Sequence, residues 1–246
     1  MSLPYFVHPD AATFTQGTTV HLHGVEGHHA AVVRRMRSGE QLVLTDGAGA
    51  AATCVVASAE RKSLHVVVES VANVPLEDPR VTVVQAIPKG ARADLAVEML
   101  TEVGADVIVP WAAERCVGVW KGDRAEKQLA KWRNTAREAA KQARRPNFPE
   151  VSPMANTADV VALLQACSVP VVLHEAASGP LGDIPIPGRG SIVVVVGPEG
   201  GITEAELAQF AVVGAEPVRL GSSVLRTSTA GVAAVAALLA RTRRSG

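Results

Sequence analysis

Two glycine-containing segments near the C-terminus carry the residues that point most directly to chemistry. The first, SIVVVVGPEGGITEAEL, covers residues 191–207, and the second, RLGSSVLRTSTA, covers residues 219–230. In each of them a short apolar strand runs into a glycine turn and then into a helix, an arrangement that lets bare backbone approach a small ligand. Two such turns in one C-terminal region suggest a single composite cofactor site.

The first turn lacks the pattern of a phosphate-binding loop. Thr203 and Glu206 form a capping-box signature, so a helix begins there and the glycines lie in the loop just before it. The P-loop pattern G-x-x-x-x-G-K-[ST] is absent, and no lysine follows these glycines, so we expect a ligand other than phosphate. Gly47, Gly49 and Ala52 come nearest to a dinucleotide fingerprint, but a strand-like run follows them, and we interpret them as a hairpin turn.

The pattern of predicted secondary structure changes around residues 74–80. Before this point short strand-like runs predict a small β-barrel or sandwich, and they lie at 18–22, 41–45, 52–57 and 64–71. After the proline-bracketed linker, strands alternate with helices, which predicts an α/β domain with a mostly parallel sheet covered on both faces. Its strands are expected at 81–87, 105–110, 169–174, 191–196 and 217–220, and its helices at 92–102, at 123–145, from Thr203 and from about Ser228. The predicted domains are residues 1–73 and 74–246.

The composition is that of an ordinary globular protein. A chain of 246 residues can form one large or two modest domains. Because its formal net charge is zero, any polyanion that binds it would have to bind at a local basic patch. The three cysteines are widely spaced, which favours a reducing cytoplasm over a disulfide framework. The apolar runs are too short for a membrane span and the N-terminus has no signal-peptide pattern, so we expect a cytoplasmic protein without membrane contact.

Positive charge and histidine are both concentrated locally. The predicted helix at 123–145 has a basic outer face, and VVRRMRSG forms a second basic cluster; each is either a solvated face or an RNA contact. Aromatic residues make up only 3%, so any RNA would be recognised by phosphate and shape rather than by base stacking. The stretch HLHGVEGHH could ligate zinc, but H-E-x-x-H is absent and the cysteines are distant. We expect no metal site.

A longer set of motifs resembles the RsmE family of SPOUT-superfamily RNA methyltransferases. GPEGG after an apolar strand, L-G-x-x-V-L-R-T further on and a helix of small residues to the C-terminus carry the resemblance. Matches to other motifs of the family follow in collinear order at His29, Arg35, Met36, Gly39, Asp46, Gly47, Glu102, Gly104, Glu114, Arg115, Trp132, Gln142, Arg145 and Pro149. The resemblance therefore covers nearly the whole chain.

This resemblance implies a fold and an activity. The expected fold is α/β, with a C-terminal SPOUT domain that has a parallel sheet and a deep trefoil knot, preceded by a small PUA-like β-barrel that helps to bind RNA. The expected protein is a homodimer that uses S-adenosylmethionine, without a metal, to methylate N3 of a specific uridine in 16S rRNA, the RNA of the small ribosomal subunit. The alternatives are a SPOUT methyltransferase that acts on another RNA and an RNA-binding protein that has lost catalysis.

The resemblance also implies roles for particular residues. The expected cofactor contacts are Leu173, His174, Gly197, Pro198, Glu199, Gly200, Gly201, Leu220, Gly221, Val224 and Leu225. The expected RNA contacts are Arg34, Arg35, Arg37, Lys141, Arg144 and Arg145.

Arg226 is the expected catalytic residue. A guanidinium stays protonated, so Arg226 would not be the base; it would hold a phosphate or stabilise charge on the uracil oxygens, or else only form a salt bridge at the start of the helix. Ser228 replaces the glutamate that is usual in the family. Glu199 either substitutes for that glutamate or only fixes its own loop.

Overall fold

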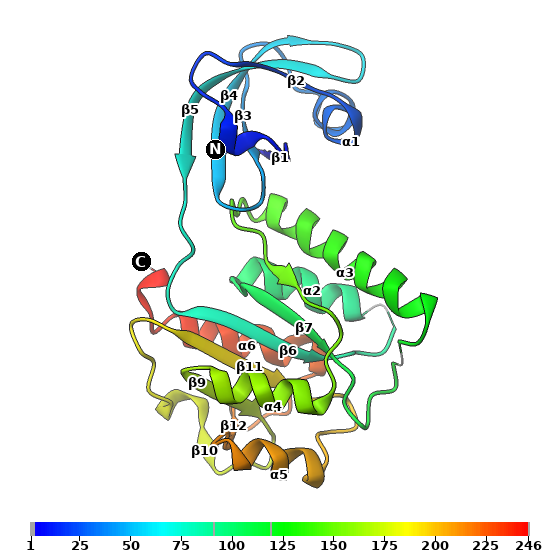
Figure 1. Cartoon of the computed structure of the whole chain (residues 1–246), viewed down its shortest axis with the longest axis vertical. Coiled ribbons are helices and arrows are strands. Elements are labelled where there is room, and N and C mark those ends of the chain that lie inside the picture. The colour runs from blue at the N-terminus through cyan, green and yellow to red at the C-terminus, as the bar shows by residue number, and fades with distance from the viewer. Residues whose placement is uncertain (1–2, 91, 119, 246) are drawn as a thin grey trace. The chain divides into compact units, whose positions relative to one another are not determined.

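The computed structural model describes residues 3–90, 92–118 and 120–245 and contains two compact units (Figure 1). The first unit comprises the residues up to Leu76 together with Ala140–Phe148, and the second comprises Glu77–Ala139 and the residues from Pro149 onward. No helix in the described ranges is both long and apolar enough to cross a bilayer. The domain limits of 1–73 and 74–246 stay a prediction.

The first unit is built on a curled sheet of five strands in the order β1-β3-β4-β5-β2. Strand β1 runs parallel to β3, and all the other neighbours are antiparallel. The strands are β1 (Tyr5–Val7), β2 (Thr19–Leu22), β3 (Gln41–Thr45), β4 (Ala50–Ala59) and β5 (Leu64–Asn73). This arrangement confirms the expectation of a small β-rich domain at the N-terminus.

Alternating side chains of the long strands form the core of this unit. In β4, Ala52, Cys54 and Val56 are buried, while the residues between them are partly exposed, as the two-residue period of a strand requires. They pack in one cluster with Phe6 and Leu42. Burial raises the pKa of Cys54 to about 12, and the charge of Glu69 adds to this, so Cys54 is a neutral core thiol.

A buried ion pair joins two helical segments within the first unit. Lys141 lies at the end of α3 (Asp123–Gln142), and its Nζ is 2.9 Å from Oε1 of Glu26 in α1 (Gly24–His28). The two side chains are only 4% and 9% exposed. The other carboxylate oxygen of Glu26 accepts a hydrogen bond from the backbone N–H of Val7, so one buried carboxylate holds both β1 and the end of α3.

The second unit contains a fully parallel sheet of seven strands, which confirms the predicted α/β architecture. The strand order is β10-β12-β9-β11-β6-β7-β8. The strands are β6 (Arg80–Ala86), β7 (Val107–Trp111), β8 (Glu150–Val151), β9 (Val169–Leu173), β10 (Gly179–Pro180), β11 (Ser191–Val196) and β12 (Pro217–Arg219).

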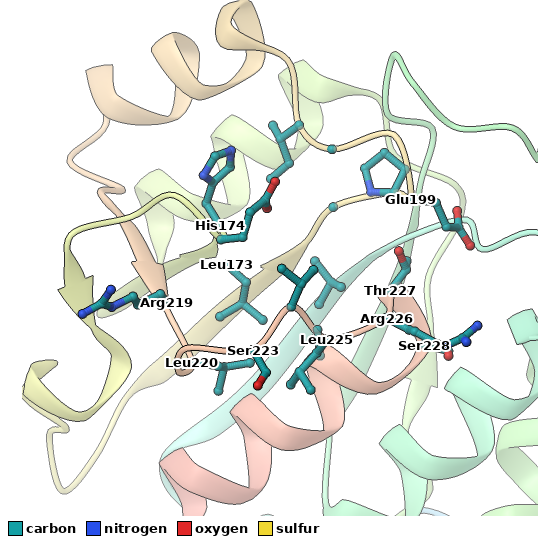
Figure 2. Close-up of a pocket in the computed structure, with 18 of the residues that line it drawn as sticks. Leu173, His174, Glu199, Arg219, Leu220, Ser223, Leu225, Arg226, Thr227 and Ser228 are labelled. Atoms are coloured by element: carbon teal, nitrogen blue, oxygen red, sulfur yellow. The ribbon is translucent and has the colours of Figure 1, made fainter.

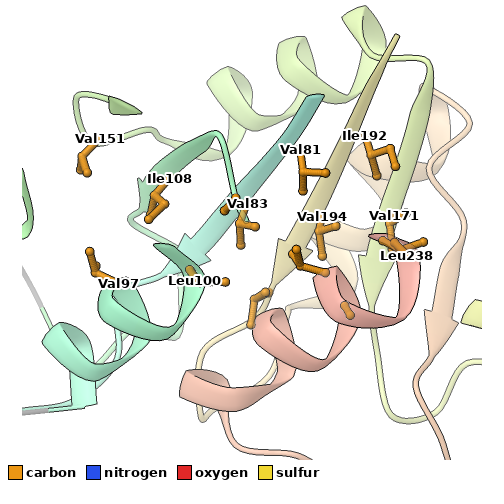
Figure 3. Packing of buried hydrophobic residues seen from close by; sticks show 14 of the residues in the cluster. Val81, Val83, Val97, Leu100, Ile108, Val151, Val171, Ile192, Val194 and Leu238 are labelled. Atoms are coloured by element: carbon orange, nitrogen blue, oxygen red, sulfur yellow. The ribbon is translucent and has the colours of Figure 1, made fainter. Parts of the chain in front are cut away.

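Helices cover both faces of this sheet because its central strands are apolar on both sides. Ile192 and Val194 of β11 pack toward α2, α3 and α6, whereas Val193 and Val195 pack toward α4 and α5. Figure 3 shows the first of these layers, with Leu100 of α2 and Leu238 of α6 against the sheet. The remaining helices are α2 (Arg92–Val103), α4 (Thr157–Ala166), α5 (Glu204–Val212) and α6 (Thr227–Leu239).

The observed helices differ from the predicted ones at three places. The helix expected at 123–145 ends at Gln142, because Arg144 adopts a left-handed backbone conformation with φ of 56°. The sequence analysis missed α4, although Asn156 and Asp159 form a complete capping box at its start. Helix α1 was not expected either, and His28 and His29 lie in helical turns.

The Lys141–Glu26 pair predicts a large local loss of stability in Lys141→Met. This variant leaves a buried carboxylate without its ammonium partner, which costs about 3–5 kcal/mol. The measurement is native-state hydrogen exchange of the β3 and β4 amides, from which the free energy of opening is obtained.

The matched control is Lys131→Met, because Lys131 is 57% exposed and also forms an ion pair, with Asp94, so its loss should change stability by less than about 1 kcal/mol. The double variant Glu26→Leu/Lys141→Met removes both charges and should recover much of the loss. Equal losses in the single and double variants would contradict this account.

Candidate functional site

A cavity of about 530 Å³ opens at the carboxyl edge of the parallel sheet (Figure 2). Strands β6, β9, β11 and β12 all run in the same direction, so the loops that follow them meet at this edge. The pocket is lined by Lys89, Arg92, Leu173, His174, Glu175, Val196, Gly197, Pro198, Glu199, Gly201, Ile202, Arg219, Leu220, Gly221, Ser223, Val224, Leu225, Arg226, Thr227, Ser228 and Ala230. Its volume is that of an ordinary small-molecule site.

Every residue expected to contact a cofactor lines this pocket, with the exception of Gly200. Gly200 packs instead against Arg115, since a Cβ added to it would lie 3.0 Å from Arg115 Cβ. The guanidinium of Arg115 donates a hydrogen bond to the carbonyl oxygen of Gly200 at 3.2 Å. Gly201 has φ of 75°, which other residues rarely adopt. The first glycine turn is thus held from behind and presents its backbone to the cavity.

The buried carboxylate of Glu206 fixes the start of α5 directly after this turn. Its Oε2 accepts hydrogen bonds from the backbone N–H and the hydroxyl of Thr203, at 2.9 Å and 3.1 Å, which completes the capping box. Its Oε1 accepts from the backbone N–H of Glu114 at 2.9 Å and from the Thr157 hydroxyl at 3.3 Å. One side chain therefore joins the loops that follow β7 and β11 to the start of α4.

The second turn leaves its backbone available to a ligand. None of the hydrogen bonds that the structure gives for its described residues involves the backbone of 221–225. Leu173, Leu220 and Leu225 lie close together on this side of the pocket in Figure 2. Apolar side chains beside unpaired backbone groups suit a flat ring with polar edges, because the faces can pack and the edges can hydrogen-bond.

Several cations lie around the pocket. Arg226 is the N-cap residue of α6 and is exposed, and the structure gives it no ion pair within the described ranges. Lys89 and Arg92 also line the cavity, and the sequence analysis missed both because they lie far from the glycine turns in the chain. The backbone N–H of Lys89 donates to Oε1 of Glu199 at 3.2 Å. Glu199 thus ties the first glycine turn to the segment after β6.

The start of α6 is packed tightly against β6. Ser228 is buried, with 3% of its surface exposed, although it lies at the edge of the pocket. The side-chain amide of Gln85 donates hydrogen bonds to the carbonyl oxygens of Ala86, at 3.0 Å, and of Thr227, at 3.3 Å. The hydroxymethyl group of Ser228 fits this confined position.

Cysteine chemistry is disfavoured near the pocket. Burial raises the pKa of the Cys116 thiol, and the charges of Glu199 and Glu206 raise it further. The Sγ atom lies 3.6 Å from the carbonyl oxygen of Trp111. Cys116 is therefore a poor nucleophile, since nucleophilic attack requires the thiolate.

One basic residue of the VVRRMRSG cluster and two from the end of the predicted 123–145 helix come together in the first unit. Arg34, Lys141 and Arg144 border a small hollow of about 40 Å³ together with Tyr5 and His29. The arginines are exposed, but Lys141 is buried in its ion pair with Glu26 and does not present its ammonium on the surface. Arg35, Arg37 and Arg145 do not line this hollow.

Comparisons with known proteins agree with this architecture. Residues 76–239 match the family model described as an RNA methyltransferase domain, and residues 24–69 match the RNA methyltransferase PUA domain. A Mycobacterium bovis protein named ribosomal RNA small subunit methyltransferase E is 47% identical over 93% of this chain and 88% of its own length. The Bacillus subtilis protein of the same name is 29% identical over 95% of this chain and 94% of its own length.

Two solved structures resemble the whole chain. The ribosomal RNA small subunit methyltransferase E of Neisseria gonorrhoeae, bound to S-adenosylmethionine, has a TM-score of 0.84 at 31% identity and covers 97% of this chain and 98% of its own. A Legionella pneumophila methyltransferase with bound S-adenosylmethionine has a TM-score of 0.86 at 29% identity and covers 98% of this chain and 99% of its own.

The hydrogen bonds of Glu206 predict a specific effect of Glu206→Gln. The amide nitrogen of glutamine cannot accept the hydrogen bonds that one carboxylate oxygen now accepts, so buried donors lose their partner at a cost of about 1–3 kcal/mol. Urea unfolding followed by tryptophan fluorescence measures this loss, because Trp111, Trp120 and Trp132 all lie in the second unit.

Glu204→Gln is the control, since Glu204 is exposed on the same helical turn and should change stability by less than about 0.5 kcal/mol. An equal effect of the two substitutions would mean that the hydrogen bonds of Glu206 do not stabilise this unit.

Proposed function

The chain belongs to the ribosomal RNA small subunit methyltransferase E family, which is a family of S-adenosylmethionine-dependent RNA methyltransferases, and we propose that it methylates N3 of a specific uridine in 16S rRNA. The observation that supports this most directly is the single cavity formed by the two glycine turns at the carboxyl edge of the sheet. Fold and pocket together favour a transferase over an RNA-binding module without catalysis.

The residues of the pocket fit S-adenosylmethionine. Leu173, Leu220 and Leu225 offer apolar surface for the adenine ring, and the unpaired backbone of 221–225 offers donors and acceptors for its edge. The turn at 197–201 has three glycines, whose backbone could approach the cofactor closely, and the carboxylate of Glu199 would suit the positive charge of a sulfonium. When bound, the cofactor supplies an activated methyl group, and the protein must align the acceptor nitrogen with it.

The cations at the pocket suit the chemistry of the acceptor base. Loss of the N3 proton leaves negative charge on the two uracil oxygens, which a fixed cation stabilises. Arg226 takes this role in our proposal because it is exposed at the cavity. Lys89 and Arg92 add positive charge that can hold the neighbouring phosphates of the RNA strand. Glu199 is assigned to fixing its loop, through the hydrogen bond from Lys89 N–H.

The hollow of the first unit supplies a second contact with RNA. Arg34 and Arg144 are exposed beside Tyr5, whose pKa is raised by burial and lowered less by Arg144, so its hydroxyl remains a donor. Two guanidinium groups and a phenol form a donor set that suits a phosphate. We assign Arg35, Arg37 and Arg145 to the same RNA contact, with Lys141 as a buried support beneath it.

The family also suggests an assembly and a location. We propose a homodimer with a trefoil-knotted C-terminal domain whose active site draws on both copies. A ribosomal substrate places the proposed reaction in the cytoplasm.

The decisive experiment uses small ribosomal subunits from a strain that lacks the corresponding gene. The protein is incubated with these subunits and labelled S-adenosylmethionine, and the modified nucleoside is mapped by mass spectrometry. We expect one 3-methyluridine in 16S rRNA, and none when wild-type subunits are used. Methylation of another base, or of transfer RNA instead, would refute the proposed specificity. Failure to bind S-adenosylmethionine in calorimetry would refute the proposal that the protein is a methyltransferase.

Arg226→Ala should separate turnover from cofactor binding. Removing one stabilising donor lowers the rate constant by about a hundredfold or more, while the dissociation constant for S-adenosylmethionine should stay close to that of the wild type. Arg243→Ala is the matched control, because Arg243 is exposed and does not line the pocket. Equal losses of binding and turnover in Arg226→Ala would remove the substrate role that we assign to it.

A further inference from the structure

A cluster of metal-ligating side chains lies on the sheet of the first unit. It consists of His21 in β2, His65 in β5 and Glu60 in the turn between β4 and β5. One potential ligand atom from each of the three side chains lies within 4.8 Å of the other two. His21 and Glu60 are exposed and His65 is partly exposed, so an ion could reach them from solvent.

The backbone of the sheet fixes the two histidines opposite each other. His21 and His65 are direct partners in the antiparallel β2–β5 pair, so their side chains leave the same face of the sheet. Their imidazole rings are stacked, with centroids 4.5 Å apart and planes only 7° from parallel, so one ring must turn about its Cβ–Cγ bond for both to bind one ion. Because the register of two paired strands sets this arrangement, the histidines are held together without the help of a flexible loop.

Glu60 completes a three-ligand set. Its Oε1 lies 3.1 Å from Nε2 of His65, and its Oε2 accepts a hydrogen bond from the hydroxyl of Ser63 at 2.7 Å. Nitrogen and oxygen ligands each about 2.0–2.1 Å from a tetrahedral zinc ion stand roughly 3.3 Å apart, so this spacing is close to that of a bound pair.

A third imidazole is near the cluster. The ring of His23 is 5.3 Å from that of His21, centroid to centroid, and His23 is exposed just before α1. At this distance from His21, the His23 ring can supply a further ligand to the ion. A water molecule can take any coordination position that remains. His28 and His29, from the same histidine-rich stretch, are not members of this cluster.

We propose that His21, His65 and Glu60 form a binding site for zinc or a similar divalent transition-metal ion. Imidazole nitrogens prefer such ions, whereas magnesium and calcium prefer oxygen ligands. This proposal differs from the expectation of no metal site, because two of the three ligands come from a distant part of the chain that strand pairing brings to His21. The site is independent of the methyltransferase reaction.

Calorimetric titration of the full-length, tag-free protein with zinc chloride tests this site. We expect one zinc ion per chain and no comparable binding of magnesium. His21→Ala and His65→Ala should each weaken zinc binding by more than about tenfold, and Glu60→Gln should weaken it by about tenfold. His28→Ala is the matched control, since it removes an exposed histidine of the same stretch but leaves the cluster intact, and zinc affinity should not change.

Circular dichroism of each variant establishes that its fold is retained, so that a loss of binding reports on the ligands. Retention of the wild-type affinity by the double variant His21→Ala/His65→Ala would overturn the proposal. An equal loss in His28→Ala would do the same, because it would mean that zinc binds histidines without regard to their arrangement.

Discussion

The parallel alignment of β6, β9, β11 and β12 is the constraint on which the site depends. Strand β11 is apolar on both faces, so helices pack on each side of it and hold it in the middle of the sheet. Because β6, β9 and β12 run parallel to β11, the loops that follow all four strands meet at one edge of the sheet. Residues that are distant in sequence line one pocket because the loops after these parallel strands all lie at the same edge of the sheet.

Buried polar groups give this edge its definite shape. Glu206 accepts hydrogen bonds from Thr203, Glu114 and Thr157, and Gln85 donates to Thr227, so the ends of several elements are joined by a few side chains. Such groups are costly to bury without partners, which makes the paired arrangement strongly preferred.

The sequence was informative where local patterns decide the structure. Strands β3 and β11 match their predicted bounds, and the capping box placed the start of α5. The composite pocket could be expected because both glycine turns follow strands. The contributions of Lys89 and Arg92, the burial of Lys141 and the pairing of His21 with His65 could not, because each depends on strand pairing or packing between distant segments. The missed helix α4 was different, since its capping box was visible in the sequence.

The pairing of β6 with β11 also determines when the second unit can fold during synthesis. Val83 is opposite Val194, so the central pair of the sheet cannot form until the ribosome has made β11. Helix α6, which covers one face of this sheet, is translated later still. Chains emerge at about 5–20 residues per second, so the edge of β6 that pairs with β11 stays open for several seconds, even though β7 on its other side is made earlier. During that time the open edge of β6 can pair with a strand of another polypeptide.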